Sequence, residues 1–154
     1  MDIEVETVEL QDQPALCVRF RTSMDKITDD IGRTYGAIFA QLGKAGGIPV
    51  GPPLALYYDM NMNRDDFEME TCVPVVSKVP GAGEVVFRVL PGGKFLSTMH
   101  RGPYDTMEPT YEALFAQMKE NGLELTGPTR EVYLTDPSQL ERPEDNLTQI
   151  LFPL

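Results

Sequence analysis

The sequence predicts an α+β fold made of two related halves, each with an antiparallel sheet and one main helix. Two observations support this prediction: a repeat at an offset of 76 residues, and eight strand-like stretches joined by short turn signals. Short turns favour antiparallel pairing because parallel strands need long crossovers. At 154 residues the chain suits one domain, 1–154, with internal repeats at about 1–78 and 79–154.

The repeat is clearest between residues 34–58 and 110–134, which align without a gap and share ten identities. Periodicity alone explains two similar helices, but it does not place a Gly-Pro and then a tyrosine at matched distances beyond each helix. The sequence therefore indicates an internal duplication. The identical pairs are Thr34/Thr110, Tyr35/Tyr111, Ala37/Ala113, Phe39/Phe115, Ala40/Ala116, Gln41/Gln117, Gly46/Gly122, Gly51/Gly127, Pro52/Pro128 and Tyr57/Tyr133.

Each half contains one amphipathic helix. In the first half, apolar residues recur at steps of three and four, which predicts a helix over residues 23–44 capped by Thr22 or Ser23. The counterpart in the second half covers about 105–121 and ends at Gly122.

The remaining regular segments are strands. One helix per half covers one face of a sheet, so the other face is expected to be buried between the halves or to serve as a binding surface. The predicted strands are residues 3–10, 15–21, 53–60, 67–76, 84–90, 93–100, 130–135 and 147–152.

Composition excludes several functions. The net charge of -11 repels phosphate backbones, so direct nucleic-acid binding is not expected. No apolar stretch approaches the roughly 18 to 20 residues of a membrane span, and the amino terminus lacks signal-peptide features, which predicts a cytoplasmic protein with no membrane association. The acidity serves solubility, or favours a basic partner or cationic small molecules. Cys17 and Cys72 lack metal-site spacing and are expected to be buried thiols, so no metal and no cofactor is predicted.

The two copies differ in the strand after each Gly-Pro, where Ala55 of the first copy corresponds to Glu131 of the second. Strand alternation places Glu131 and Tyr133 on one face, and we expect Val132 and Leu134 to face the helices. A carboxylate at mid-strand among apolar residues is costly to desolvate unless a partner meets it. The alternatives are a solvated face or a pair with Arg or Lys from a neighbouring strand.

The functional alternative is a cationic ligand held by the carboxylate and aromatic rings. At an effective dielectric constant near 20, a charge pair about 4 Å apart is worth roughly 4 kcal/mol before desolvation. Each well-placed tyrosine ring adds on the order of 0.5 to 2 kcal/mol. The carboxylate would therefore determine charge preference, and the rings would determine affinity and shape.

Three segments resemble the GyrI-like small-molecule-binding family: Leu90–Gly93, His100–Asp105 and Arg130–Leu134. That family provides the effector-binding domain of AraC-type and multidrug-sensing bacterial regulators, and also stand-alone proteins. The resemblance implies a tandem duplicated strand-helix-strand-strand fold with pseudo-twofold symmetry and a ligand in the groove between the halves. No helix-turn-helix segment precedes residue 1, so a stand-alone member is expected, and a transcriptional role would require a separate DNA-binding chain.

The resemblance also implies the site residues. Glu131 matches a central glutamate that binds lipophilic cations in drug-sensing relatives, and Tyr133 and Tyr104 occupy family motif positions. Tyr57 and Ala55 are added to the ligand-binding set through the internal repeat.

Other conspicuous side chains are assigned structural roles. Tyr35 and Tyr111 lie on helix faces and are expected in the core. His100 is the only histidine and has no partner imidazole in the sequence, so it is expected to cap or orient the following turn.

Three functions remain open. The favoured one is a small-molecule binding protein for lipophilic, cationic aromatic compounds. The second, which the resemblance suggests, is a hydrolase of strained cyclopropanoid toxins, with Glu131 as general base and Tyr133 or Tyr104 as proton donor. Some hydrolytic relatives use tryptophan, which this chain lacks. The third is a gyrase-interacting protein similar to the family's namesake.

Overall fold

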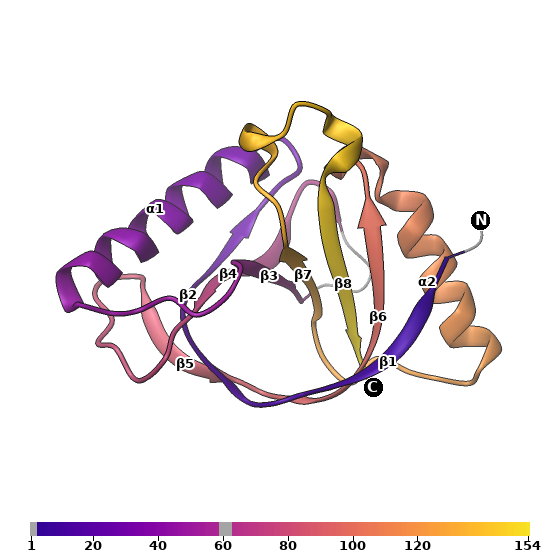
Figure 1. Cartoon of the computed structure of the whole chain (residues 1–154), viewed down its shortest axis with the longest axis horizontal. Helices are drawn as coiled ribbons and strands as arrows, with labels where there is room; N and C mark the ends of the chain where they lie inside the picture. The colour runs from indigo at the N-terminus through magenta and orange to yellow at the C-terminus, as the bar shows by residue number, and fades with distance from the viewer. Residues whose placement is uncertain (1–2, 59–62) are drawn as a thin grey trace. The chain divides into compact units, whose positions relative to one another are not determined.

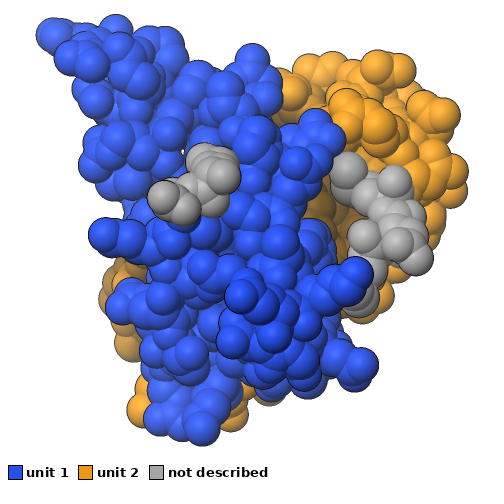
Figure 2. All heavy atoms as spheres, turned by 90° about the vertical axis from the view of Figure 1, so that its right-hand side faces the viewer, with its two compact units in different colours: residues 1–10, 93–154 blue, residues 11–92 orange. Residues whose placement is uncertain are grey.

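A computed structural model describes residues 3–58 and 63–154 and shows the expected α+β fold (Figure 1). Among those residues, the chain forms eight strands and two α-helices, and the sheets are antiparallel. It divides into two compact units, coloured separately in Figure 2. Unit 1 comprises Met1–Leu10 and Gly93–Leu154, and unit 2 comprises Gln11–Gly92.

Unit 2 is a four-stranded sheet with one helix. Its strands are β2 (Gln13–Thr22), β3 (Leu54–Tyr57), β4 (Phe67–Pro74) and β5 (Val86–Leu90), in the order β5-β2-β4-β3. Helix α1 (Ile27–Ala45) lies along β2 and β4 (Figure 1). Its core contains Ile38 and Leu42 of the helix against Leu16, Val18 and Val73 of the sheet. Because Leu16 and Val18 alternate with Cys17, the cysteine lies on the opposite face of the sheet.

Unit 1 has the same organisation. Its strands are β1 (Val5–Leu10), β6 (Gly93–Arg101), β7 (Thr129–Tyr133) and β8 (Leu147–Pro153), in the order β1-β6-β8-β7. Helix α2 (Glu108–Glu120) follows a short 3-10 helix, Tyr104–Thr106. Leu114 and Met118 of α2 pack against Leu96, Ile150 and Phe152 of the sheet.

The two units have corresponding strand orders, and in each unit the edge strand, β1 or β5, pairs with a strand that is not its neighbour in sequence. β1 precedes β2 in sequence yet pairs with β6, and β5 precedes β6 yet pairs with β2. In unit 2, the Oδ1 atom of Asp12, just before β2, accepts a hydrogen bond of 2.7 Å from the backbone N–H of Gly92, just after β5. This bond fixes the two segments at which the chain passes from one unit to the other.

Element boundaries differ from the sequence prediction mainly at helix starts. Helix α1 begins at Ile27, later than expected, after Lys26 as N-cap with no side-chain cap. The hydroxyl of Thr22 instead donates to Oδ2 of Asp30, in the first turn of the helix, at 2.7 Å, so Thr22 contacts the helix but does not cap it. Strand β3 ends at Tyr57, and the last two positions of the predicted strand 53–60 lie outside the described residues.

Within residues 3–58 and 63–154, no helix combines the length and apolar character needed to cross a membrane.

The core of unit 1 provides a test of the packing. Leu114 is 0% exposed, whereas Leu123, just beyond α2, is 37% exposed. We expect Leu114→Ala to lower the free energy of unfolding by about 2 to 5 kcal/mol, because it leaves a cavity under α2. Leu123→Ala should lower it by less than about 1 kcal/mol. Urea denaturation measures both, and equal losses would contradict the described packing.

Candidate functional site

The candidate site begins with Glu131, at the middle of β7 in unit 1. Its Cα partner across the sheet is Ile150, a core residue that packs under α2. Residues directly opposite on antiparallel strands have their side chains on the same face. Glu131 therefore lies on the helix-covered face of the unit 1 sheet, and its side chain is partly buried.

Two phenol groups hold the Glu131 carboxylate. The hydroxyl of Tyr111, on α2, donates to Oε2, and the hydroxyl of Tyr133, two residues along β7, donates to Oε1 at 3.1 Å. Hydrogen bonds to a charged acceptor stabilise its ionised form. Each oxygen thus has a phenol donor, one from the helix and one from the strand.

A third tyrosine extends this cluster. The ring of Tyr104, in the 3-10 helix before α2, meets the ring of Tyr133 edge to face, with centroids 5.7 Å apart. Burial raises the pKa of Tyr104, a side-chain hydrogen bond with Asn146 lowers it, and the negative charge of Glu131 raises it. Tyr104 is therefore neutral near pH 7 and presents an aromatic edge next to the carboxylate.

The expectation that Val132 and Leu134 face the helix is wrong. Val132 is paired with Gln149, whose Nε2 donates to Ser97 at 3.0 Å on the face away from α2. Leu134 lies beyond the end of β7 and is exposed. Strand alternation correctly grouped Glu131 with Tyr133. The apolar character of Val132 and Leu134 did not reveal which face the helix covers, because polar side chains can lie under a helix when they have hydrogen-bond partners.

Aromatic residues of the core adjoin the site. The Phe152 ring lies 5.9 Å from the ring of Tyr111 and 4.8 Å from that of Phe115, measured between centroids. Phe152 is fully buried, while Phe115 is partly exposed. One end of the Tyr111 ring therefore contacts an apolar wall, and its hydroxyl contacts the carboxylate.

Tyr111 is the site residue that sequence analysis missed. It was expected only in the core, and it does pack against the unit 1 core, but its hydroxyl reaches Glu131. Its repeat partner, Tyr35, donates instead to the backbone carbonyl of Leu54 at 2.5 Å. In unit 2 the position of Glu131 is occupied by Ala55, which has no carboxylate to accept the bond.

Tyr57 and Ala55 belong to β3 of unit 2, not to unit 1. Ala55 is fully buried opposite Thr71, whose hydroxyl donates to Thr34 of α1 at 2.9 Å. Tyr57 is partly buried at the end of the strand. Their membership of the same ligand site as Glu131 stays a prediction.

His100 has the structural role expected of it. It is buried, its Nδ1 lies 2.9 Å from the Thr110 hydroxyl, and its Nε2 lies 3.0 Å from the Thr106 hydroxyl and 3.2 Å from the Pro103 carbonyl. These contacts join β6 to the turn that leads into α2. His100 thereby fixes the segment that contains Tyr104.

A hollow of about 590 Å³ lies beside β1 and β6 in unit 1. His100 and Thr110 are part of its wall, together with residues of both strands; Glu131 is not. At Glu131 itself, a bulky ligand would have to displace a phenol hydroxyl that now bonds to the carboxylate.

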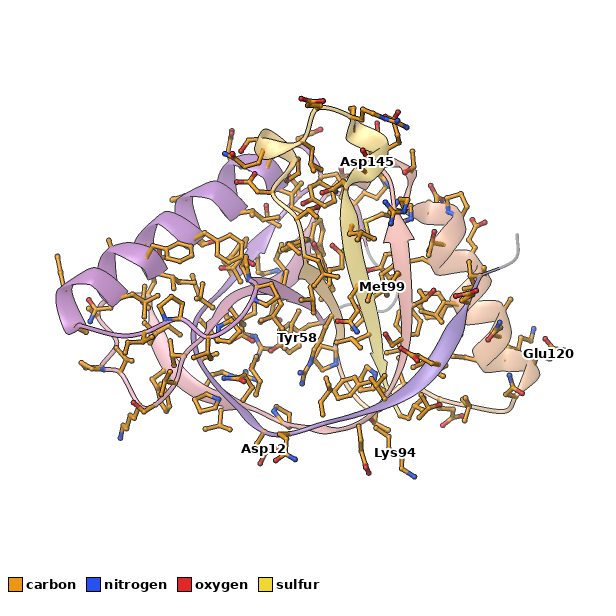
Figure 3. All side chains as sticks on the ribbon, in the orientation of Figure 1. Asp12, Tyr58, Lys94, Met99, Glu120 and Asp145 are labelled. Carbon is orange, nitrogen blue, oxygen red and sulfur yellow. The ribbon has the colours of Figure 1, made fainter. Side chains whose placement is uncertain are left out.

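Unit 2 contains a second buried carboxylate, Glu70 of β4, which sequence analysis did not single out. The hydroxyl of Tyr58 donates to its Oε1 at 2.5 Å, and Nη1 of Arg88 donates to the same oxygen at 3.2 Å. Tyr58, labelled in Figure 3, also lies under the guanidinium of Arg19, 3.8 Å from its ring centre. Burial first, and then the bond to Glu70, raises the pKa of Tyr58 to about 12.

Comparison with known proteins places this chain in a family. The GyrI-like small molecule binding domain family matches residues 3–154, and the chain belongs to that family. None of the curated proteins matches the chain.

Several solved structures share the fold. The EcmrR C-terminal domain is 24% identical with a TM-score of 0.85, and the match covers 99% of this chain and 98% of that one. In the EcmrR–DNA complex the match is 23% identical, with a TM-score of 0.87, and covers 97% of this chain but 56% of the EcmrR chain. This chain thus spans little more than half the length of that EcmrR chain.

Two further neighbours have lower identity. A hydrolase encoded by lin2189 from Listeria innocua is 16% identical with a TM-score of 0.68, covering 97% of this chain and 91% of that one. SAV2435, in a structure bound to tetraphenylphosphonium, is 13% identical with a TM-score of 0.67, covering 98% and 93%. At these identities the likeness establishes the fold.

The Tyr58–Glu70 bond predicts a pH dependence. The pKa of folded Tyr58 lies above its ordinary value of 10, so its contribution to stability is fully present below about pH 10 and lost as the pH rises through about 12. Because Tyr58 is half exposed, we expect a loss of only about 1 kcal/mol. Urea unfolding at several pH values should show a shallower decline for Tyr58→Phe than for wild type; identical declines would contradict this assignment.

Proposed function

We propose that the chain is an effector-binding module that takes lipophilic cations beside Glu131. The observation that supports this proposal is the partly buried carboxylate held by the hydroxyls of Tyr111 and Tyr133. Membership of the small-molecule binding family gives the general class of function. The site then suggests the charge and character of the ligand.

Electrostatics favour a cation. The two phenols orient the carboxylate before the ligand arrives, and a bulky cation then replaces the Tyr111 hydroxyl at Oε2. In a partly buried site, a charge pair about 4 Å apart is worth roughly 4 kcal/mol before desolvation. The rings of Tyr104 and Tyr133 add aromatic surface beside the carboxylate.

Lipophilic character follows from the surroundings. The core wall beside Tyr111 consists of Phe152 and Phe115, and a strongly hydrated cation would lose its water there without replacement. A cation with a delocalised or shielded charge loses less. Tetraphenylphosphonium, which SAV2435 binds, has this character and is the natural first probe.

As an effector-binding module, the chain would act through a protein that responds to the ligand. EcmrR combines a domain of this fold with additional chain in its DNA complex. By analogy, we propose that a DNA-binding regulator is the partner of this chain rather than DNA itself, because the chain has a net charge of -11.

Glu131→Gln tests the proposal. Isothermal titration with tetraphenylphosphonium should show at least a tenfold loss of affinity, because the amide keeps the shape of the side chain but removes its charge. Glu120→Gln makes the same change at the exposed end of α2, labelled in Figure 3, and should leave the affinity unchanged. Triphenylphosphine oxide, a neutral analogue, should bind the wild type and Glu131→Gln with similar affinity.

Unchanged tetraphenylphosphonium affinity in Glu131→Gln would contradict the proposal. So would an equal loss in Glu120→Gln, since this would indicate general attraction to an acidic surface rather than a site.

Hydrolysis of a strained ring is a second candidate function. The Tyr133 hydroxyl, a possible proton donor, lies 3.1 Å from Oε1 of Glu131, the possible base, and two structural neighbours are described as hydrolases. Glu131 would take a proton from water, the hydroxide oxygen would bond to a ring carbon, and the ring C–C bond would break. The electron pair of that bond would accept a proton from Tyr133 or Tyr104.

This candidate predicts product formation from a cyclopropanoid electrophile, followed by mass spectrometry. Turnover should disappear in Glu131→Gln while the substrate still binds, because only the general base is lost. An unchanged substrate after prolonged incubation with wild type would exclude this reaction and leave the binding proposal intact.

A further inference from the structure

Strand pairing in unit 2 brings together three metal-ligand side chains that are far apart in sequence. Cys17 of β2 and Cys72 of β4 are direct partners in the antiparallel register, and Glu70 lies two residues before Cys72 on the same face. The two Sγ atoms and a carboxylate oxygen of Glu70 all lie within 4.8 Å of one another. The three residues are 1%, 0% and 2% exposed, respectively.

Glu70 is already oriented as metal-binding carboxylates usually are, by hydrogen bonds to one oxygen. Among the described residues, Tyr58 and Arg88 both donate to Oε1. These two bonds fix the orientation of the carboxylate, one oxygen of which lies within 4.8 Å of both sulfur atoms. Arg88 and Tyr58 are only partly buried, so the cluster lies directly beneath side chains that reach the surface.

The equivalent positions in unit 1 show that the fold does not require this set of side chains. The register Ser97↔Leu151 corresponds to Cys17↔Cys72, and Gln149 corresponds to Glu70. There, Gln149 Nε2 donates to the Ser97 hydroxyl at 3.0 Å. The same backbone arrangement thus exists in unit 1 with no thiol and no carboxylate at these positions. The sheet therefore does not require the three side chains found in unit 2.

We propose that Cys17, Cys72 and Glu70 form a binding site for a thiophilic divalent cation, with Zn²⁺ as the best match. Thiolates and carboxylates are both zinc ligands, and a water molecule or a second carboxylate contact would complete four-coordination around these three residues. With Zn–S bonds of about 2.3 Å and Zn–O bonds of about 2.0 Å, the donors of a tetrahedral site lie roughly 3.5 to 3.8 Å apart. The cluster therefore needs adjustments of about 1 Å.

Charge balance explains how such a site is tolerated in a buried position. On binding, each thiol releases one proton to solvent, and two Zn–S bonds form without oxidation or reduction. Two thiolates and Glu70 then contribute three negative charges, and Zn²⁺ and Arg88 contribute three positive charges. The assembled cluster is neutral, which avoids the cost of an uncompensated buried charge.

Protons compete with the metal at this site. Burial, and then the neighbouring Cys17, raises the pKa of the Cys72 thiol. Forming two Zn–S bonds displaces a proton from each thiol, so the apparent affinity should rise with pH.

Cobalt(II) titration of the full, phosphine-reduced chain tests the site, because Co²⁺ bound to thiolates gives a charge-transfer absorption. The chain has two cysteines, so this absorption can arise from no other thiols. We expect one equivalent of Co²⁺ to bind, two protons to be released into weakly buffered solution, and Zn²⁺ to displace Co²⁺.

Each test substitution replaces a residue of the proposed site by the residue at the equivalent position of unit 1. Cys17→Ser and Cys72→Leu should each abolish the two-thiolate absorption, and Glu70→Gln should retain it with an affinity about 10 to 100 times lower. Glu68→Gln, on the same strand and face but paired with Arg19, is the matched control and should bind as the wild type does. Circular dichroism and thermal unfolding establish that each variant is folded.

Absence of the charge-transfer absorption in the reduced wild type would overturn the proposal. Co²⁺ binding of equal affinity in folded Cys72→Leu, or in Glu70→Gln, would do so as well. None of these results depends on binding of lipophilic cations at Glu131.

Discussion

The function proposed for this chain depends on one interaction: the bond between the Glu131 carboxylate and the hydroxyls of Tyr111 and Tyr133. A carboxylate on the helix-covered face of a sheet is costly unless polar partners meet it. The two phenols reduce this cost while leaving aromatic surface around the charge. The same arrangement therefore makes the fold tolerate the carboxylate, and in our proposal it also prepares the carboxylate for a positive ligand.

The common architecture of the two units explains how one unit can differ at its sheet face without loss of the fold. Both units have one helix over a four-stranded antiparallel sheet with the same strand order. Glu131 replaces the apolar Ala55 on the helix-covered face, and Cys17, Glu70 and Cys72 stand where unit 1 has Ser97, Gln149 and Leu151. At these positions one unit has carboxylates or thiols, whereas the other unit has an alanine, serine, glutamine or leucine on an equivalent backbone.

Much of the fold could be predicted because periodicity and turns determine it locally: both helices and all eight strands were expected, as was the structural role of His100. The site was predicted in part. Strand alternation identified Glu131 and grouped it with Tyr133, but it did not reveal that this face lies under α2, and so Tyr111 was missed as a partner. The Cys17–Cys72 pair depends on strand register across 55 positions of the sequence, which spacing alone does not give.

A crystal structure of the chain with tetraphenylphosphonium would test the central claim most directly. The account predicts that the phosphonium lies beside the Glu131 carboxylate, among the rings of Tyr104 and Tyr133, with the Tyr111 hydroxyl displaced from Oε2. A complex in which both phenol–carboxylate bonds persist and the cation occupies another part of the molecule would contradict it.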